Sequence, residues 1–285
     1  MADAQSYFIP HGTKWPILGS IGLTCLLGGF ANLLNDGGGG SQAFMWVGAA
    51  VIIFMMFGWF GTVVGESETG TYNKQVDISF RWGMGWFILS EVMFFAAFFG
   101  ALFYARIYSV PWIGGEGSGE ATNAFLWPSF EAVWPTNGPE NVGGSYSAMG
   151  AWGLPALNTV ILLSSGVTVT WAHWGLLKNN RGQLIIGLLA TVILGFLFVG
   201  FQAEEYIHAY KELNLTLGTG IYGSTFFMLT GFHGLHVSIG ALILAVVLIR
   251  SIKGHFSPEN HFAFEAAAWY WHFVDVVWLF LFAAI

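Results

Sequence analysis

The stretch AWYWHFVDVVWLFLF, from Ala268 to Phe282, decides the class of fold. It is apolar enough to cross a bilayer, yet it contains His272 and Asp275. A charged side chain at membrane depth costs roughly 3 kcal/mol or more unless it is paired or faces the inside of a helix bundle. The stretch therefore predicts a membrane-spanning helix that packs against other helices through its two polar residues.

The composition places the whole chain in the membrane. Of its 285 residues, 55% are hydrophobic, 18% are aromatic and only 9% are charged, which is typical of an integral membrane protein. The net charge of -7 argues against a nucleic-acid partner. The single cysteine, Cys25, excludes an intramolecular disulfide and a thiolate metal cluster. The first residues lack a signal-peptide pattern, so we expect the first apolar helix to remain as the insertion signal.

The apolar runs predict how often the chain crosses the membrane. A helix that spans about 30 Å of hydrocarbon needs about 20 apolar residues. Seven runs meet this length: Pro16 to Leu34, Ala43 to Gly65, Met84 to Tyr108, Pro155 to Leu177, Leu184 to Tyr206, Ile221 to Ile249 and Phe264 to Ile285. The sequence therefore predicts an all-α integral membrane protein with seven transmembrane helices.

The basic residues predict the orientation, because Lys and Arg collect in the short cytoplasmic loops. Arg106 and Lys211 fall on one side of the predicted spans. The other basic residues fall on the opposite side, in the N-terminus and the even-numbered connections: Lys14, Lys74, Arg81, Lys178, Arg181, Arg250 and Lys253. This distribution predicts that the N-terminus is inside and the C-terminus outside.

Two connections suggest how the chain is divided. The segment from Ser109 to Ser147 is rich in Gly, Pro and Trp, and we expect residues 109–150 to form an outer-face loop lying on the membrane or a partner. The polar residues 66–83 form an inner, cytoplasmic link. This link would separate an N-terminal part with two helices, residues 1–65, from a five-helix part, residues 84–285.

Three polar residues in the third and sixth predicted spans are candidate functional residues. Glu91 is either a buried, hydrogen-bonded carboxyl or a proton-handling group, and the sequence leaves both interpretations open. His233 and His236 are three residues apart and project from one helix face. Such a pair can ligate a metal or haem, but no Cys, Asp or Glu completes a ligand shell. We therefore favour hydrogen bonds from both histidines to a neighbouring helix.

His272 and Asp275 repeat this spacing in the last span. The third and seventh helices both begin at the inner face, so Glu91 lies at a depth comparable to these two residues. We therefore predict that these three residues form a shared polar layer in the inner half of the bundle. His173 and His208 lie near helix ends and are interpreted as ordinary interfacial histidines.

Several long motifs carry a family resemblance. NTVILLSSGVTVTWAH, YGSTFFMLTGFHGLHVSIG and HFAFEAAAWYWHFVDVVWLFLF occur in this order, and FRWGMGWFILSEVMFF and KWPILGS precede them. From about Lys14 to its end, the chain resembles subunit III of the haem-copper cytochrome c oxidases. In this sequence, "helix three" and "helix seven" of the family correspond to the runs that hold Glu91 and Asp275.

The resemblance implies an accessory, non-catalytic subunit of a redox-driven proton translocase. Haem and copper would be held by partner subunits, and this chain would hold no metal and no cofactor except structural phospholipids. The implied partners are subunits I and II, with cytochrome c reached only through the complex. The implied fold is a 2 + 5 arrangement of helices around a V-shaped, lipid-filled cleft. The implied roles are stabilising subunit I and supporting its proton uptake while oxygen is reduced to water.

The resemblance also implies roles for single residues. Glu91 takes the position of the buried glutamate of helix three, and Glu66 and Arg81 take positions associated with lipid head groups. Gly65 stands where mitochondrial members have an arginine, which is a departure from the head-group pattern. The long connection after helix three favours a bacterial inner membrane over a mitochondrial one.

Other functions remain as alternatives. Within the family, the chain could serve a quinol oxidase or a nitric-oxide-reductase-associated homologue, which differ in the partner's electron donor. A haem-binding electron carrier would use His233, His236 or His272. A secondary transporter would use Glu91 as its coupling carboxylate, but the chain lacks the strong internal repeat that marks many transporters.

Overall fold

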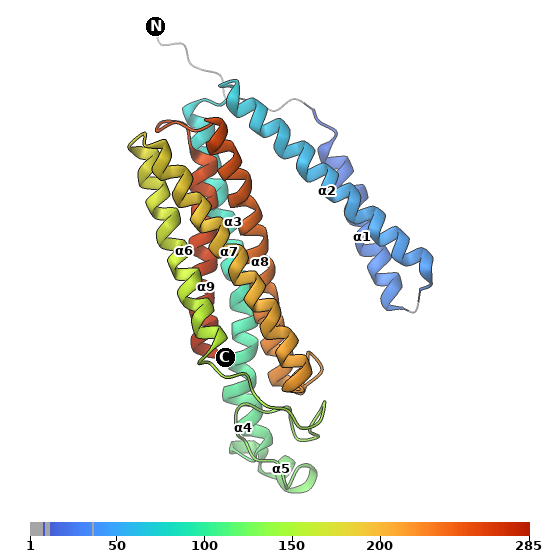
Figure 1. Cartoon of the computed structure of the whole chain (residues 1–285). Coiled ribbons are helices and arrows are strands. Elements are labelled where there is room, and N and C mark those ends of the chain that lie inside the picture. Colours follow the sequence, from blue (N-terminus) through green and yellow to red (C-terminus); the bar gives the residue numbers. More distant parts are fainter. Residues whose placement is uncertain (1–7, 9–11, 36) are drawn as a thin grey trace. The chain divides into compact units, whose positions relative to one another are not determined.

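The computed structural model describes residues 8, 12–35 and 37–285, and these form long helices joined by connections of different lengths (Figure 1). Within the described residues, seven helices are long and apolar enough to cross a membrane. The long helices are α1 (Trp15–Leu34), α2 (Gly39–Glu68), α3 (Lys74–Tyr104), α6 (Leu154–Leu177), α7 (Arg181–Glu212), α8 (Gly220–Lys253) and α9 (Phe262–Ala284). The prediction of an all-α, multi-pass membrane protein is confirmed.

Helices suit this sequence because a spanning helix satisfies its backbone hydrogen bonds internally, where lipid offers no partner. Local signals set several helix ends. Pro16 and Pro155 stand in the first turns of α1 and α6, where a missing N–H costs nothing. The Asn180 side chain accepts a hydrogen bond from the Gln183 N–H at the start of α7. Gly254 ends α8 at a φ of 83°, a left-handed conformation that glycine adopts readily.

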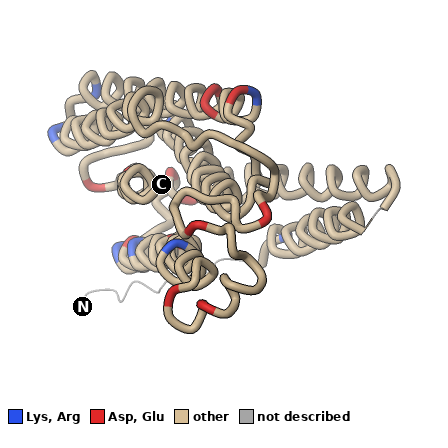
Figure 2. Tube along the Cα trace, turned by 90° about the horizontal axis from the view of Figure 1, so that it is seen from below, with Lys and Arg blue, Asp and Glu red and all other residues tan. Residues whose placement is uncertain are grey.

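Charged residues avoid the middle of most helices. Figure 2 shows that most Lys, Arg, Asp and Glu lie at helix ends or in connecting segments. Glu91 in α3 and Asp275 in α9 are exceptions to this pattern. These two residues therefore need partners within the protein.

The chain divides into two compact units, and the first runs from Met1 to Phe80. In this unit α1 and α2 pack closely through glycines. A Cβ on Gly29 would lie 2.6 Å from the Met45 backbone nitrogen, so only glycine permits this approach. Gly48 faces the backbone of α1 in the same way, at Leu26. Most large apolar side chains of α1 and α2 remain exposed on this unit, as expected for helices that contact lipid or another protein.

The second unit runs from Arg81 to Ile285 and contains most of α3 with α6, α7, α8 and α9. Trp271 of α9 is fully buried at its centre. Its ring fills the space left by two glycines, Gly195 of α7 and Gly240 of α8, and its Nε1–H donates to the Ser165 hydroxyl over 2.8 Å. The Trp271 side chain thus contacts α6, α7 and α8. The small residues opposite it leave the space that its large ring needs.

The helix boundaries differ most from the prediction around α3. The predicted span began at Met84, but α3 begins at Lys74, and the connection from α2 shrinks from the predicted 66–83 to residues 69–73. The helix can extend past its apolar run because its backbone hydrogen bonds do not depend on hydrophobicity. The Asn73 side chain also accepts from the Val76 N–H, which supports the new first turn.

The predicted outer-face loop, residues 109–150, is partly ordered into short helices. A π-helical turn at Ala105–Ser109 leads into α4 (Val110–Ile113), and α5 (Glu120–Leu126) follows. The later part of the segment is fastened to the α7–α8 turn, because the Ser147 N–H donates to the Leu213 carbonyl and the Tyr222 N–H donates to the Thr136 carbonyl. The segment therefore covers this end of the five-helix bundle.

Candidate functional site

Glu91 and His236 form a partly buried pair between α3 and α8. His236 Nε2 lies 2.8 Å from Glu91 Oε2, and the two side chains are only 12% and 21% exposed. The other ring nitrogen, Nδ1, lies 2.6 Å from the Phe232 carbonyl, which can only accept a hydrogen bond. Nδ1 must therefore carry a proton. The contact between Nε2 and Glu91 then holds one further proton. If this proton is on Nε2, an imidazolium faces a carboxylate; if it is on the carboxyl oxygen, both groups are neutral. The net charge of the pair is zero in both cases.

Aromatic rings enclose this pair. Phe95 meets the His236 ring edge-on at 5.0 Å between centroids, and Tyr270 stacks on it at 6.3 Å. An apolar wall of this kind strengthens the electrostatic contact inside it, because it lowers the local dielectric constant. The pair is thus suited to hold a proton within the bundle, and equally suited to fix α3 against α8.

His233 lies one helical turn before His236 but faces a different neighbour. Its side chain is fully buried, and Nε2 donates to the Val274 carbonyl of α9 over 3.2 Å. The Trp278 ring lies 5.0 Å from the imidazole between centroids. The two histidines of α8 therefore make separate contacts with α9 and α3, although their spacing places them on one side of the helix.

His272 and Asp275 of α9 face α6. Asp275 is 6% exposed and packs against Gly166, where a Cβ would collide with the carboxylate. His272 is half-exposed; its Nδ1 lies 3.5 Å from Asp275 Oδ2, and its Nε2 lies 3.2 Å from the Thr170 hydroxyl. The polar layer predicted from the sequence is thus distributed over two interfaces, α3 with α8 and α6 with α9.

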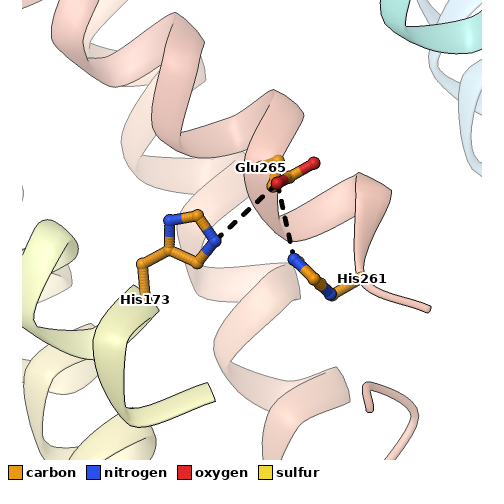
Figure 3. Close-up of side chains that lie close together, drawn as sticks. All are labelled: His173, His261 and Glu265. Carbon is orange, nitrogen blue, oxygen red and sulfur yellow. Dashed lines mark ion pairs between the residues drawn. The ribbon is translucent and has the colours of Figure 1, made fainter. Parts of the chain in front are cut away.

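A third polar cluster joins α3, α6 and α9 at the end of the bundle where α9 begins. His173, His261 and Glu265 point toward one another (Figure 3). His261 Nε2 lies 3.4 Å and His173 Nε2 lies 3.9 Å from Glu265 Oε1. The other oxygen, Oε2, forms an ion pair with Arg81 of α3. The sequence did not predict this cluster, because His173 was interpreted as an ordinary interfacial histidine. The only local sign of the cluster in the sequence is the spacing of four residues between His261 and Glu265.

The donor set of this cluster is one that can ligate a metal. Two imidazoles and a carboxylate are ligands that Zn²⁺ accepts, and the three ligand atoms lie within 4.8 Å of one another. Ligands of tetrahedral Zn²⁺ lie about 3.3 Å apart, since each is about 2.05 Å from the metal. His261 Nε2, 3.4 Å from Glu265 Oε1, already lies near that spacing, whereas His173 Nε2, at 3.9 Å, would have to move closer. Arg81 already balances the Glu265 charge in the present arrangement.

The two residues expected to contact lipid head groups both have protein partners. Glu66, in the first unit, accepts a hydrogen bond from the Tyr72 hydroxyl over 2.6 Å. Burial, and then the hydrogen bond to Glu66 and its charge, raises the pKa of Tyr72. Arg81, in the second unit, pairs with Glu265 and lies over the Phe262 ring at 5.7 Å. Its side chain is 34% exposed.

Comparisons with known proteins agree over nearly the whole chain. The model of the family described as "Cytochrome c oxidase subunit III" matches residues 5–285. The chain is 45% identical over 287 residues to cytochrome c oxidase subunit 3 of Marchantia polymorpha, covering 100% of this chain and 97% of that protein. It is 42% identical to the Arabidopsis thaliana protein of the same name, with the same coverage, and 40% identical to that of Carassius auratus, covering 99% of this chain and 97% of that protein. The chain therefore belongs to the cytochrome c oxidase subunit III family.

Proposed function

We propose that this chain is the accessory, non-catalytic subunit III of a proton-pumping cytochrome c oxidase. It binds structural phospholipids, stabilises subunit I and supports proton uptake by subunit I, and haem and copper belong to the partner subunits. The proposal rests on one observation, which is that titratable groups inside the bundle are paired with one another. Glu91 is matched by His236, and Asp275 is matched by His272. Such pairs can hold and position protons, while electron transfer takes place in the partners.

The role in proton uptake rests on the Glu91–His236 pair. One proton is shared between Glu91 Oε2 and His236 Nε2, 2.8 Å apart, so it can change its carrier without a change in the net charge of the pair. Glu91→Gln keeps the size and hydrogen-bonding capacity of the side chain but removes the titratable group. The proposal expects normal assembly and slower turnover of the intact oxidase at high pH, where proton delivery is most demanding. Identical pH profiles for mutant and parent would contradict the role in proton uptake.

Phospholipid binding rests on Arg81, whose side chain is 34% exposed and carries a charge that can pair with a phosphate. Glu66, as an acceptor, would suit an amine-bearing head group. The test is the phospholipid content of the purified complex. Arg81→Gln should lower it, whereas Lys178→Gln, which removes an exposed charge at the C-terminal end of α6, should not. Equal phospholipid content in the two variants would remove Arg81 from the lipid site.

The partners and the membrane follow from the same proposal. Purification in mild detergent should recover the chain with subunits I and II, because its many exposed apolar side chains need cover from protein or lipid. A chain that is stable, monodisperse and free of partners would contradict this. We place it in a bacterial inner membrane, with the N-terminus inside on the basis of its basic residues. Protease accessibility of the two termini in sealed vesicles tests this orientation.

A further inference from the structure

Another buried carboxyl lies beside Ile285 in the five-helix bundle. Glu205 of α7 is only 3% exposed, and its Oε2 has no hydrogen-bond partner among the described residues. Gln202 lies three residues earlier, on the same helix face, and is 6% exposed. Neither its amide nitrogen nor its amide oxygen has a partner in the described part of the chain. These groups are separate from the Glu91–His236 pair.

Glu205 lines a small cavity beside this position. The cavity has a volume of about 50 Å³, and Tyr222, Thr230 and Trp278 also line it. Residues 149–151 and Ile285 also line it. One water molecule needs about 10–15 Å³ of such space, so the cavity has room for roughly three.

The protein groups around the cavity cannot fully satisfy Glu205. The Thr230 hydroxyl donates its proton to the Phe226 carbonyl, 2.6 Å away, and therefore accepts from the Tyr206 hydroxyl, also 2.6 Å away. Thr230 has no proton left for the Glu205 oxygen. A carboxyl group that is buried without a hydrogen-bond partner destabilises the fold, and more so if it is charged. A small molecule that both donates and accepts hydrogen bonds would remove this cost.

We propose that Glu205 binds a cluster of water molecules in this pocket. Water fits the volume and supplies the donor that Glu205 Oε2 needs. Gln202 does not line the cavity and is not part of this site. A bound Ca²⁺ would require six to eight oxygen ligands, which one carboxylate does not approach. The cluster gives the bundle a hydrated carboxyl at the opposite end from the His173–His261–Glu265 cluster.

The test is a structure of the intact oxidase at a resolution that shows ordered water, for the parent and for three variants of this chain. Density for water is expected within about 3.2 Å of Glu205 Oε2 in the parent, and it should persist in Glu205→Gln, which can still hydrogen-bond. Glu205→Leu should lose it. Glu204→Leu is the matched control, because Glu204 is the adjacent residue and is exposed, and this variant should keep the water.

A second readout does not depend on density. Radiolysis of water produces hydroxyl radicals that oxidise neighbouring side chains, so a bound water labels even a buried residue. Trp278 is 3% exposed and lines the cavity, and its labelling in the intact oxidase should fall several-fold in Glu205→Leu relative to Glu204→Leu. Equal labelling in the two variants would overturn the proposal. So would a parent structure in which Glu205 contacts only protein atoms while other buried waters are visible.

Discussion

His236 Nε2 lies 2.8 Å from Glu91 Oε2, although 145 residues separate the two in the chain. The contact places a neutral, proton-sharing pair at the interface of α3 and α8, because Nδ1 of the same ring is committed to the Phe232 carbonyl. Glu91 thus meets the condition for a carboxyl at membrane depth, since it is matched within the bundle and does not face lipid unpaired.

The first prediction concerns the structural part of this pair. Glu91→Leu should destabilise the packing of α3 against α8 by about 1–3 kcal/mol, because it leaves Nε2 of the partly buried His236 without its partner. Glu91→Gln should cost less, since its amide can still hydrogen-bond to the ring. The measurement is the temperature at which this subunit dissociates from the purified oxidase. Equal dissociation temperatures for the Leu and Gln variants would show that the hydrogen bond contributes nothing.

The second prediction concerns the close packing around Trp271. Gly195→Ala should destabilise the bundle by about 1–3 kcal/mol, because its Cβ would lie 2.8 Å from a rigid indole ring that is buried on all sides. Gly200→Ala is the matched control on the same helix, since no atom lies within 4 Å of its Cβ and alanine favours the helix. Thermal unfolding of the two variants in the complex should separate them, with the control at or above the parent.

The third prediction concerns the ion pair between Arg81 and Glu265. Arg81→Gln and Glu265→Gln should each lower the stability of the complex, and the double variant should cost less than the sum of the two. We expect a coupling energy of about 1 kcal/mol, because the Arg81 side chain is one-third exposed and solvent weakens the pair. Additive effects would mean that the two side chains are energetically independent.

The fourth prediction concerns pH and the Tyr72 hydroxyl. Burial, the hydrogen bond to Glu66 and the charge of Glu66 all raise the pKa of Tyr72, so the folded chain holds this proton more tightly than the unfolded chain. Its contribution to stability is complete below the unfolded pKa of about 10 and is lost as the pH rises further. The stability difference between the parent and Tyr72→Phe should therefore be constant below pH 10 and shrink above it, as measured by thermal unfolding across this range. A difference that grows above pH 10 would reverse the sign and contradict the assignment.

Some features were predictable from the sequence because they depend on local length and composition alone. Crossing about 30 Å of hydrocarbon requires about 20 apolar residues in a helix, whatever the neighbours are, so seven runs of that length predicted seven candidate spans. Glu91 and Asp275 were recognisable as candidates for the same reason, since a charge within such a run is costly and therefore uncommon.

The choice of partners was decided only by the tertiary structure. His233 and His236 are one turn apart, yet one contacts α9 and the other α3, because three residues rotate the side chain by about 60° around the helix. The cluster of His173, His261 and Glu265 was hidden in the sequence, because its members come from two helices and each alone is an ordinary residue near a helix end. Glu205 likewise became a candidate only when packing buried it without a partner. The sequence determined which segments enter the membrane, because that depends on the free energy of transferring each segment from water into lipid. The tertiary structure decided which polar groups meet, because that depends on the rotation and spacing of helices that are distant in the chain.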